Sequence, residues 1–362
     1  MAFRDGFGSK EIIVGHEGSS YCDQKTAAAT DACDALATFI FRFASCLLTR
    51  RILRKVVFYA PLRNFWRRGS LCPSTAIKRM LVILFRVLSV FPLRMLHAFG
   101  SMLGWLVYLS SPSYRRRLDA NLALAGYGAQ RRAAVAEAGK AIVELAFVWC
   151  GKPERVARHA TVENWEMVQR VLDAGRGIVF LTPHLGCFEM TAQQIALHTA
   201  LTVMYRPPKK NALKPLVEGA RARHNLHLAP ANLSGVRILA KTLKGGQPIG
   251  LLPDQVPQEG EGVWAPFFGR PAYTMTLPAK LAQLGRADIL LVYAERLPKG
   301  HGYVVRFVPF EGDLSGSPAE QAASINRAME ALIARCPAQY FWSYNRYKQP
   351  EGVAAPQAEA VA

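Results

Sequence analysis

The sequence predicts an α/β fold with a mixed, partly parallel sheet flanked by helices and preceded by an apolar, membrane-associated helical segment. Three observations predict it. Short β-rich runs alternate with helical periods in the second half of the chain, a long apolar stretch lies in the first half, and 51% of the residues are hydrophobic against 20% charged. This composition supports a sizeable core and excludes a disordered protein.

The N-terminal part divides into two segments. We expect residues 1–79 to be an atypical basic extension, partly disordered, in which a polar start leads into a basic amphipathic stretch. Residues 80–117 are the expected membrane-anchoring segment, because the run 95–114 contains no Lys, Arg, Asp or Glu and approaches the length of a bilayer crossing. Flanking basic residues favour a helix in the interface, a hairpin broken at Pro92 or two crossings over a single crossing. A buried core helix is the alternative.

Residues 118–348 form the expected α/β domain. Helical periodicity covers 118–176, and strands then alternate with helices. The predicted strands are 177–183, 201–205, 248–254, 288–297 and 303–310, and the predicted helices are 190–200, 236–244 and 318–337. Such alternation implies a partly parallel sheet covered by helices. We expect residues 349–362 to be a disordered tail.

The chain is strongly basic, with 45 Lys and Arg against 26 Asp and Glu and a formal net charge of +19. Nucleic acid, an anionic membrane or a phosphorylated substrate would each supply the counter-charge. We expect no nucleic-acid partner, because no zinc-finger spacing or RNA-recognition aromatic motif occurs and the apolar segment would stay unexplained. The seven cysteines form no CxxC pair and no zinc spacing, which predicts reduced thiols and no metal site.

The sharpest local feature runs from Thr182 to Glu189, where a β-run ends at Pro183 and a helix begins soon afterwards. His184 therefore falls at the carboxyl end of a strand, where α/β sheets carry their sites. His184 and Glu189 can meet only if the histidine lies in the turn before the helix, because residues five apart on a helix point about 140° apart. Such a pair could act as general base and orienting carboxylate. A capping histidine beside an exposed glutamate is the alternative.

Polar residues follow two further predicted strands. Arg206 and Lys209 suit a phosphate or a carboxylate, with a solvated basic loop as the alternative. Asp254 and Gln255 lie at the end of the strand 248–254, where a plain turn aspartate is the alternative. We therefore take all four as candidate substrate-binding residues.

Other candidates carry alternatives as well. Phe267 and Phe268 belong to an aromatic loop that lines a channel for an acyl chain or merely caps the core. Cys187 could act as a nucleophile with His184 as its base, although a buried, inert thiol is the commoner situation. The sequence contains no phosphate-binding glycine loop, dinucleotide fingerprint, nucleophile elbow or zinc-protease motif, so we expect no metal and no organic cofactor.

From about residue 80 to residue 350 the sequence resembles the late (secondary) acyltransferases of lipid A biosynthesis, within the lysophospholipid acyltransferase superfamily. The resemblance rests on five ordered blocks, GIVFLTPHLGCFE, MYRPPKKN, LLPDQ, APFFGRPAYT and PAQYFWSYNRYK. It implies a glycerolipid-acyltransferase-like fold, catalysis by His184 and Glu189, and substrate binding by Arg206 and Asp254. The Cys-Phe pair before Glu189 stands where this family often has asparagine and tryptophan.

The resemblance implies transfer of a fatty acyl group from acyl carrier protein, or from acyl-CoA, to a hydroxyl of a lipid A precursor. The reaction would take place on the cytoplasmic face of the cell inner membrane. His184 would deprotonate the hydroxyl and Glu189 would orient the histidine, with no acyl-enzyme. Backbone amides around Gly186 or the Arg206 side chain are the candidate oxyanion donors.

The expected partners share one sign of charge. Acyl carrier protein, a phosphorylated lipid acceptor and an anionic membrane surface are all negative, which suits a basic chain. A lysophospholipid or other lysolipid acyltransferase is the alternative within the same class. A non-catalytic protein that binds anionic membranes or nucleic acid is the alternative from another class.

Overall fold

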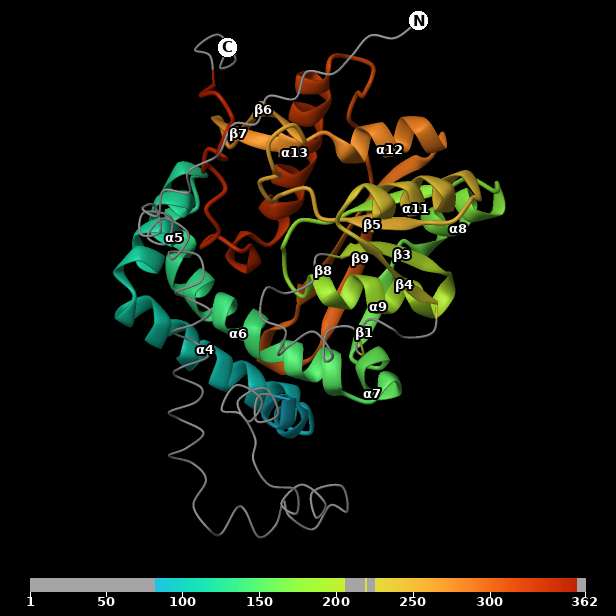
Figure 1. Ribbon diagram of the computed structural model, residues 1–362. Helices are drawn as coiled ribbons and strands as arrows, with labels where there is room; N and C mark the ends of the chain where they lie inside the picture. The colour runs from blue at the N-terminus through green and yellow to red at the C-terminus, as the bar shows by residue number, and fades with distance from the viewer. Residues whose placement is uncertain (1–81, 206–218, 220–224, 357–362) are drawn as a thin grey trace, which may run out of the picture. The chain divides into compact units, whose positions relative to one another are not determined.

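The computed structural model describes residues 82–205, 219 and 225–356, all within a compact unit that extends from Val57 to Ala362. The predicted extension 1–79 lies outside the described residues, as do Arg206 and Lys209. Figure 1 shows a central sheet with helices packed against it and a group of N-terminal helices beside it. The α/β class is confirmed.

The centre of the fold is a seven-stranded sheet in the order β1-β9-β8-β2-β5-β3-β4. Its strands are β1 (Ala160–Glu163), β2 (Ile178–Leu181), β3 (Leu201–Tyr205), β4 (Leu226–Pro230), β5 (Ile249–Leu251), β8 (Asp288–Arg296) and β9 (Tyr303–Pro309). Among these described strands β8 and β9 pair antiparallel, and the other neighbours pair parallel. The predicted mixed, partly parallel sheet is therefore confirmed.

Helices cover both faces of the sheet, because parallel neighbours need crossover connections. α9 (Phe188–His198) leads from β2 to β3, and α11 (Leu233–Lys244) leads from β4 to β5 in the opposite direction along the sheet. Right-handed crossovers in opposite directions place their helices on opposite faces, as Figure 1 shows. α12 (Leu277–Gly285) packs beside α11, and α8 (Trp165–Asp173) packs on β9.

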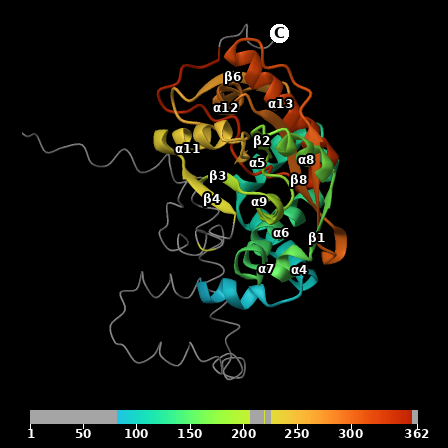
Figure 2. The ribbon, with the colours of Figure 1, turned by 90° about the vertical axis from the view of Figure 1, so that its right-hand side faces the viewer.

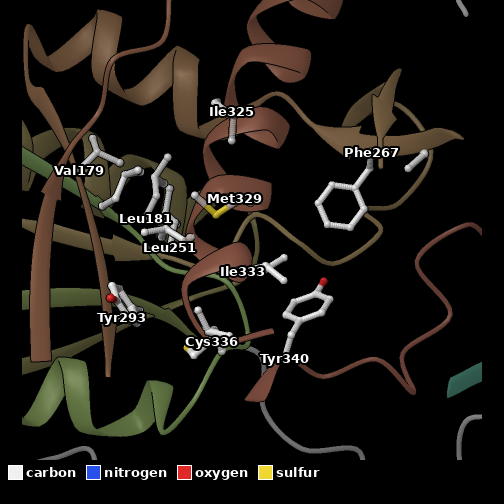
Figure 3. Close-up of a cluster of buried hydrophobic side chains, with 14 of the residues drawn as sticks. Val179, Leu181, Leu251, Phe267, Tyr293, Ile325, Met329, Ile333, Cys336 and Tyr340 are labelled. Carbon is white, nitrogen blue, oxygen red and sulfur yellow. The ribbon is translucent and has the colours of Figure 1, made fainter. Parts of the chain in front are cut away.

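The last helix, α13 (Pro318–Arg335), completes the hydrophobic core. Its N-terminus is closed by a capping box between Ser317 and Glu320. Its residues at one-turn spacing point toward the sheet (Figure 3). Labelled members of this cluster are Val179, Leu181, Leu251, Phe267, Tyr293, Ile325, Met329, Ile333, Cys336 and Tyr340. Each fully buried aliphatic side chain contributes about 1.5–3 kcal/mol.

Residues 262–275 form a hairpin, so the predicted aromatic loop was wrong. β6 (Gly262–Phe267) and β7 (Arg270–Met275) pair antiparallel across Phe268 and Gly269, which both have positive φ as a tight hairpin turn requires. Pro266 and Pro271 lie opposite each other in this hairpin. Prolines are unusual in paired strands, and they hide the strand pattern in the sequence.

The helices before the sheet form a separate layer. They are α4 (Leu93–Ser110), α5 (Pro112–Leu124), α6 (Arg131–Cys150) and α7 (Pro153–Ala157). α4 lies along α6 in both views (Figures 1 and 2). The two helices approach closely through glycines, since a Cβ on Gly139 would lie 2.0 Å from the Gly100 carbonyl oxygen.

The predicted break at Pro92 is confirmed, since residues 82–89 are helical and α4 begins at Leu93. Across the described ranges, no helix is at once long enough and apolar enough to cross a membrane. Besides the hairpin, two strands of the central sheet were missed: β1 interrupts the stretch 118–176 that the sequence predicts as helical, and β4 was not predicted. Residues 349–356 of the predicted disordered tail belong to the described residues. There, Trp264 Nε1 donates a hydrogen bond to the Ala354 carbonyl oxygen at 2.8 Å.

Candidate active site

The candidate site forms where β2 and β5 end at the same edge of the sheet. These strands are parallel neighbours, so the residues that follow them meet. His184 follows β2 and Asp254 follows β5. α9 begins at Phe188, which confirms the prediction that His184 lies in the turn before the helix.

Asp254 holds both the side chain and the backbone of His184. Its Oδ1 lies 2.8 Å from Nδ1 of the imidazole, and its Oδ2 accepts a hydrogen bond from the His184 backbone N–H at 2.8 Å. The sequence predicts Glu189 as the partner of His184, but the carboxylate on Nδ1 is that of Asp254. Glu189 lies in the first turn of α9, whereas Asp254 comes from the adjacent strand end.

The surroundings keep this carboxylate ionised. The Asp254 side chain is 3% exposed and that of His184 is 17% exposed. Burial by itself raises the pKa of Asp254, but the charge and hydrogen bonds of His184, together with the charge of Arg346, lower this pKa below its usual range. An ionised Asp254 keeps the proton of a neutral imidazole on Nδ1, which leaves Nε2 as the basic nitrogen.

Gln255 lies beside that basic nitrogen. Its side-chain Nε2 is 3.1 Å from Nε2 of His184. With Nδ1 protonated, the imidazole Nε2 accepts this hydrogen bond from the amide. Gln255 is exposed, so the basic nitrogen lies on the accessible side of the site and the aspartate on the buried side.

The backbone amides of the turn are already engaged. Leu185 N–H donates to the Pro183 carbonyl oxygen, Gly186 N–H to that of Gln339, and Cys187 N–H to that of Ala294. These three amides are therefore not free to act as oxyanion donors, although amides around Gly186 are one of the two sources suggested by the sequence. The other, Arg206, lies outside the described residues.

The structure argues against a covalent mechanism through Cys187. This cysteine is 2% exposed, and burial together with the nearby Glu144 carboxylate raises the pKa of its thiol well above the ordinary value. Thiolate formation is therefore unfavourable at neutral pH.

Glu189 lines an apolar cavity of about 60 Å³ next to the turn. The other walls come from α9, β2, β3, β4, β5 and β8, and include Phe180, Phe188, Ile195, Leu201, Val203, Leu226, Leu251 and Leu252. Phe267 instead lies in the hydrophobic core, and Phe268 packs on Tyr127 and Trp342. Of the two alternatives predicted for these phenylalanines, a channel lining or packing on the core, the structure shows packing on the core.

Residues 341–346, near the C-terminus, support the site through contacts that cannot be seen in the sequence. Phe341 N–H donates to the His184 carbonyl oxygen at 3.1 Å, and Val256 N–H donates to the Tyr344 hydroxyl at 2.9 Å. Arg346, 2% exposed, donates to the Tyr273 carbonyl oxygen and contributes to the low pKa of Asp254. The only sequence signal for this role is an aromatic cluster, because the segment is far from His184 along the chain.

Comparison with known proteins agrees with this arrangement. Residues 66–349 match the family of bacterial lipid A biosynthesis acyltransferases. The chain belongs to this family. It is therefore an acyltransferase, and its family acts in lipid A biosynthesis. Within the described residues no group of three or more His, Cys, Asp or Glu side chains is arranged to hold a metal ion.

Individual relatives are similar at modest identity. The lipid A biosynthesis lauroyltransferase of Escherichia coli K12 is 28% identical over 218 residues, 59% of this chain and 71% of that protein. The palmitoleoyltransferase of the same organism is 27% identical over 214 residues, 58% of this chain and 68% of that protein. A lipid A biosynthesis acyltransferase of Haemophilus influenzae is 26% identical over 182 residues, 49% of this chain and 55% of that protein. The first two names differ in the acyl group that they specify.

Proposed function

We propose that this acyltransferase moves a fatty acyl group from acyl-acyl carrier protein to a hydroxyl of a lipid A precursor, with His184 as general base. The observation that carries the proposal is the polarity of the His184 imidazole. One nitrogen is held by a buried, ionised carboxylate, and the other lies on the accessible side beside Gln255. An apolar cavity adjoins the same turn and offers a surface for the start of the acyl chain.

The reaction needs no acyl-enzyme. The acceptor hydroxyl takes the place of Gln255 at Nε2 of His184 and gives its proton to that nitrogen. The resulting alkoxide oxygen attacks the thioester carbonyl carbon, the carbon–sulfur bond breaks, and the leaving thiolate takes the proton from the imidazolium. The products are an ester and the free thiol of the carrier. The thioester supplies the activated acyl group, so the reaction requires no cofactor.

Asp254 is the orienting carboxylate in this proposal. It fixes the tautomer of His184 and stabilises the imidazolium that forms during the reaction. Glu189 remains a candidate catalytic residue because of the family resemblance. It lies on the wall of the apolar cavity, whereas Asp254 holds Nδ1 of His184. The amides of Leu185, Gly186 and Cys187 are engaged, so we assign the stabilisation of the oxyanion to Arg206, the other donor that the sequence suggests.

The charge of the protein supports the proposed substrates. A net charge of +19 favours an acidic carrier protein as donor, a phosphorylated lipid as acceptor and the anionic cytoplasmic face of the inner membrane as location. All three attractions weaken as the ionic strength rises, because salt screens charges that lie more than about 8–10 Å apart.

The test is an acyl-transfer assay on membranes that contain the protein or its His184→Ala variant. Acyl carrier proteins loaded with several chain lengths are the donors, and a lipid A precursor without its late acyl groups or a lysophospholipid is the acceptor. Mass spectrometry should show acyl addition to the lipid A precursor, reduced about 10²–10⁴-fold by His184→Ala. His227→Ala removes an exposed histidine of β4 and is the matched control.

Three results would contradict the proposal. Equal transfer by the His184→Ala variant would show that the histidine is structural. Transfer to the lysophospholipid alone would assign the chain a different acceptor. No transfer to either acceptor by the unmutated protein would favour a non-catalytic role at the membrane surface.

A further inference from the structure

A second hollow, of about 590 Å³, lies between α4, α6 and the turn after β8. The described residues that line it include no carboxylate. They are Arg94, His97, Ala98, Ser101, Lys140, Lys299 and His301. None of these residues takes part in the reaction proposed above, and their chemistry suits an anion.

Two of the cations in this hollow have no counter-charge among the described residues. Lys140 pairs with Glu137, and the nearby Glu144 is paired with Arg296. Arg94 and Lys299 are both exposed and form no ion pair with any residue in the described ranges. To the described residues, the Arg94 side chain gives one hydrogen bond, from Nε to the Lys299 carbonyl oxygen at 3.3 Å. No described residue therefore occupies the terminal nitrogens of its guanidinium, which suits them to a ligand.

The backbone brings these two cations together. The turn Pro298–Gly300 is packed directly against the first turn of α4, because a Cβ on Gly300 would lie 2.5 Å from both the Cα and the N of Arg94. Lys299 has a φ of 56° and Gly300 a φ of 70°. A non-glycine residue in this left-handed region is held there by its surroundings, and such residues concentrate at ligand sites.

An exposed apolar stripe runs along the neighbouring face of α4. We define the α4 stripe as Met95, Met102, Leu106 and Leu109, which are 54%, 51%, 37% and 64% exposed. At about 100° per residue these four side chains project within an arc of about 60°. The hollow-lining residues Arg94, Ala98 and Ser101 project about 60–120° to one side of Met95. One helix thus presents an apolar face and a basic hollow next to each other.

Two further apolar side chains are exposed in the turn just before α4. Val90 and Phe91 are 71% and 38% exposed. Arg155 fixes this turn, donating to the carbonyl oxygens of Ser89 at 2.6 Å and Phe91 at 2.7 Å. Apolar side chains therefore stay exposed on an ordered backbone, which is unusual unless something apolar covers them.

We propose that the hollow receives the phosphate headgroup of an anionic bilayer lipid while the α4 stripe enters the acyl-chain boundary of the same bilayer. Arg94 and Lys299 donate hydrogen bonds to the phosphate oxygens. An amphipathic helix with basic residues beside its apolar face lies in the plane of a membrane interface in this way. A soluble phosphate compound would satisfy the cations but leave the stripe in water, so a lipid fits both features. The proposal concerns binding alone and does not depend on acyl transfer.

The test is binding of the full-length protein to phosphatidylcholine vesicles with and without phosphatidylglycerol, measured by flotation. We expect Arg94→Gln/Lys299→Gln to weaken binding to the phosphatidylglycerol vesicles about 30-fold, because each basic residue at an anionic surface contributes about fivefold in affinity. Arg237→Gln/Lys241→Gln removes two exposed charges of α11 and should have no effect. Leu109→Gln should weaken binding about tenfold, whereas Leu284→Gln, at a 60% exposed leucine of α12, should not.

A second measurement separates the headgroup site from general attraction to a charged surface. A short-chain phosphatidylglycerol that stays monomeric in water should bind the unmutated protein and not Arg94→Gln/Lys299→Gln, as followed by calorimetry. Unfolding temperatures of all variants should match, since the altered side chains are exposed.

Four results would overturn the proposal. These are equal weakening by the α11 control, equal affinity for vesicles with and without phosphatidylglycerol, unchanged vesicle binding by the Arg94 and Lys299 variant, and loss of acyl carrier protein binding with vesicle binding intact. The last result would show that the hollow takes an acidic protein.

Discussion

His184 with Asp254 and His97 with Glu144 are both histidine–carboxylate pairs, with nitrogen–oxygen distances of 2.8 Å and 3.1 Å. Their surroundings differ. Glu144 also accepts hydrogen bonds from the Arg296 guanidinium and the Tyr303 hydroxyl. Its side chain is 1% exposed and that of His97 is 6% exposed, whereas the His184 side chain is 17% exposed.

The difference bears on why we propose His184, and not His97, as the base. In the His184–Asp254 pair a single carboxylate holds the buried nitrogen, and the other nitrogen lies beside the exposed Gln255. In the second pair the negative charge is neutralised by Arg296, and the pair joins α4 and α6 to β8. A histidine–carboxylate contact therefore indicates catalysis only when one nitrogen remains accessible to a substrate.

The largest expected effect comes from a substitution that disrupts the His184–Asp254 pair. Asp254→Asn should lower kcat for acyl transfer about 10²–10⁴-fold, because an amide no longer fixes the Nδ1 proton or stabilises the imidazolium. Steady-state kinetics with the acyl carrier protein donor measures this effect. A change confined to KM would instead mean that Asp254 only binds substrate.

The matching change in the second pair should act on stability. Glu144→Gln leaves the buried Arg296 without its main counter-charge, so the free energy of unfolding should fall by about 3–5 kcal/mol. Urea denaturation measures it, and Glu311→Gln, at an exposed glutamate, should change the same quantity by no more than about 0.5 kcal/mol. The kcat of the folded fraction should stay unchanged, and a large fall would mean that the two pairs are coupled.

The His97–Glu144 pair should also make the stability of the protein depend on pH. Burial alone raises the pKa of Glu144, but the charge and hydrogen bonds of Arg296 and His97 lower it from 4.5 to about 2. A lowered pKa in the folded state stabilises the protein above pH 4.5, and this contribution of about 3 kcal/mol is lost as the pH falls toward 2. Across this pH range the free energy of unfolding should fall more steeply with decreasing pH for the unmutated protein than for Glu144→Gln. Equal slopes would refute the assignment.

The smallest expected effect concerns the packing of α4 against α6, the two helices that contain His97 and Glu144. Gly139→Ala should destabilise the protein by about 1–3 kcal/mol, because the added Cβ meets the α4 backbone and outweighs the gain in helix propensity. Gly128→Ala is the control, since a Cβ there meets no atom within 4 Å. Thermal unfolding of the two variants gives the comparison, and similar midpoints would show that the helices separate without cost.

The strands and helices that carry strong local patterns were predictable. β3 has the predicted bounds, and β8, β9 and α13 differ from prediction by only a few residues. β1 was missed because a short strand is overshadowed by neighbouring helical periods. The hairpin of β6 and β7 was missed because its paired prolines resemble a loop.

The site was predictable where residues lie close in sequence or follow strand ends. His184 in its turn follows from the change of period at Pro183. That Asp254 rather than Glu189 occupies Nδ1 depends on which strand pairs with β2, and strand order is a long-range property that spacing does not encode. The supporting contacts of Phe341 and Tyr344 are long-range for the same reason.

The glycine of the turn that carries His184 has a consequence for protein synthesis. Gly186 has a φ of 59°, a Cβ there would lie 1.9 Å from the Ala294 carbonyl oxygen, and its N–H is bonded to the Gln339 carbonyl oxygen. The turn therefore gains its final shape only after residues near 340 have left the ribosome. A nascent chain that has reached only α9 therefore carries His184 without the contacts that Gln339 and Phe341 make with its turn, so the proposed base should become active only once this later segment has folded against it.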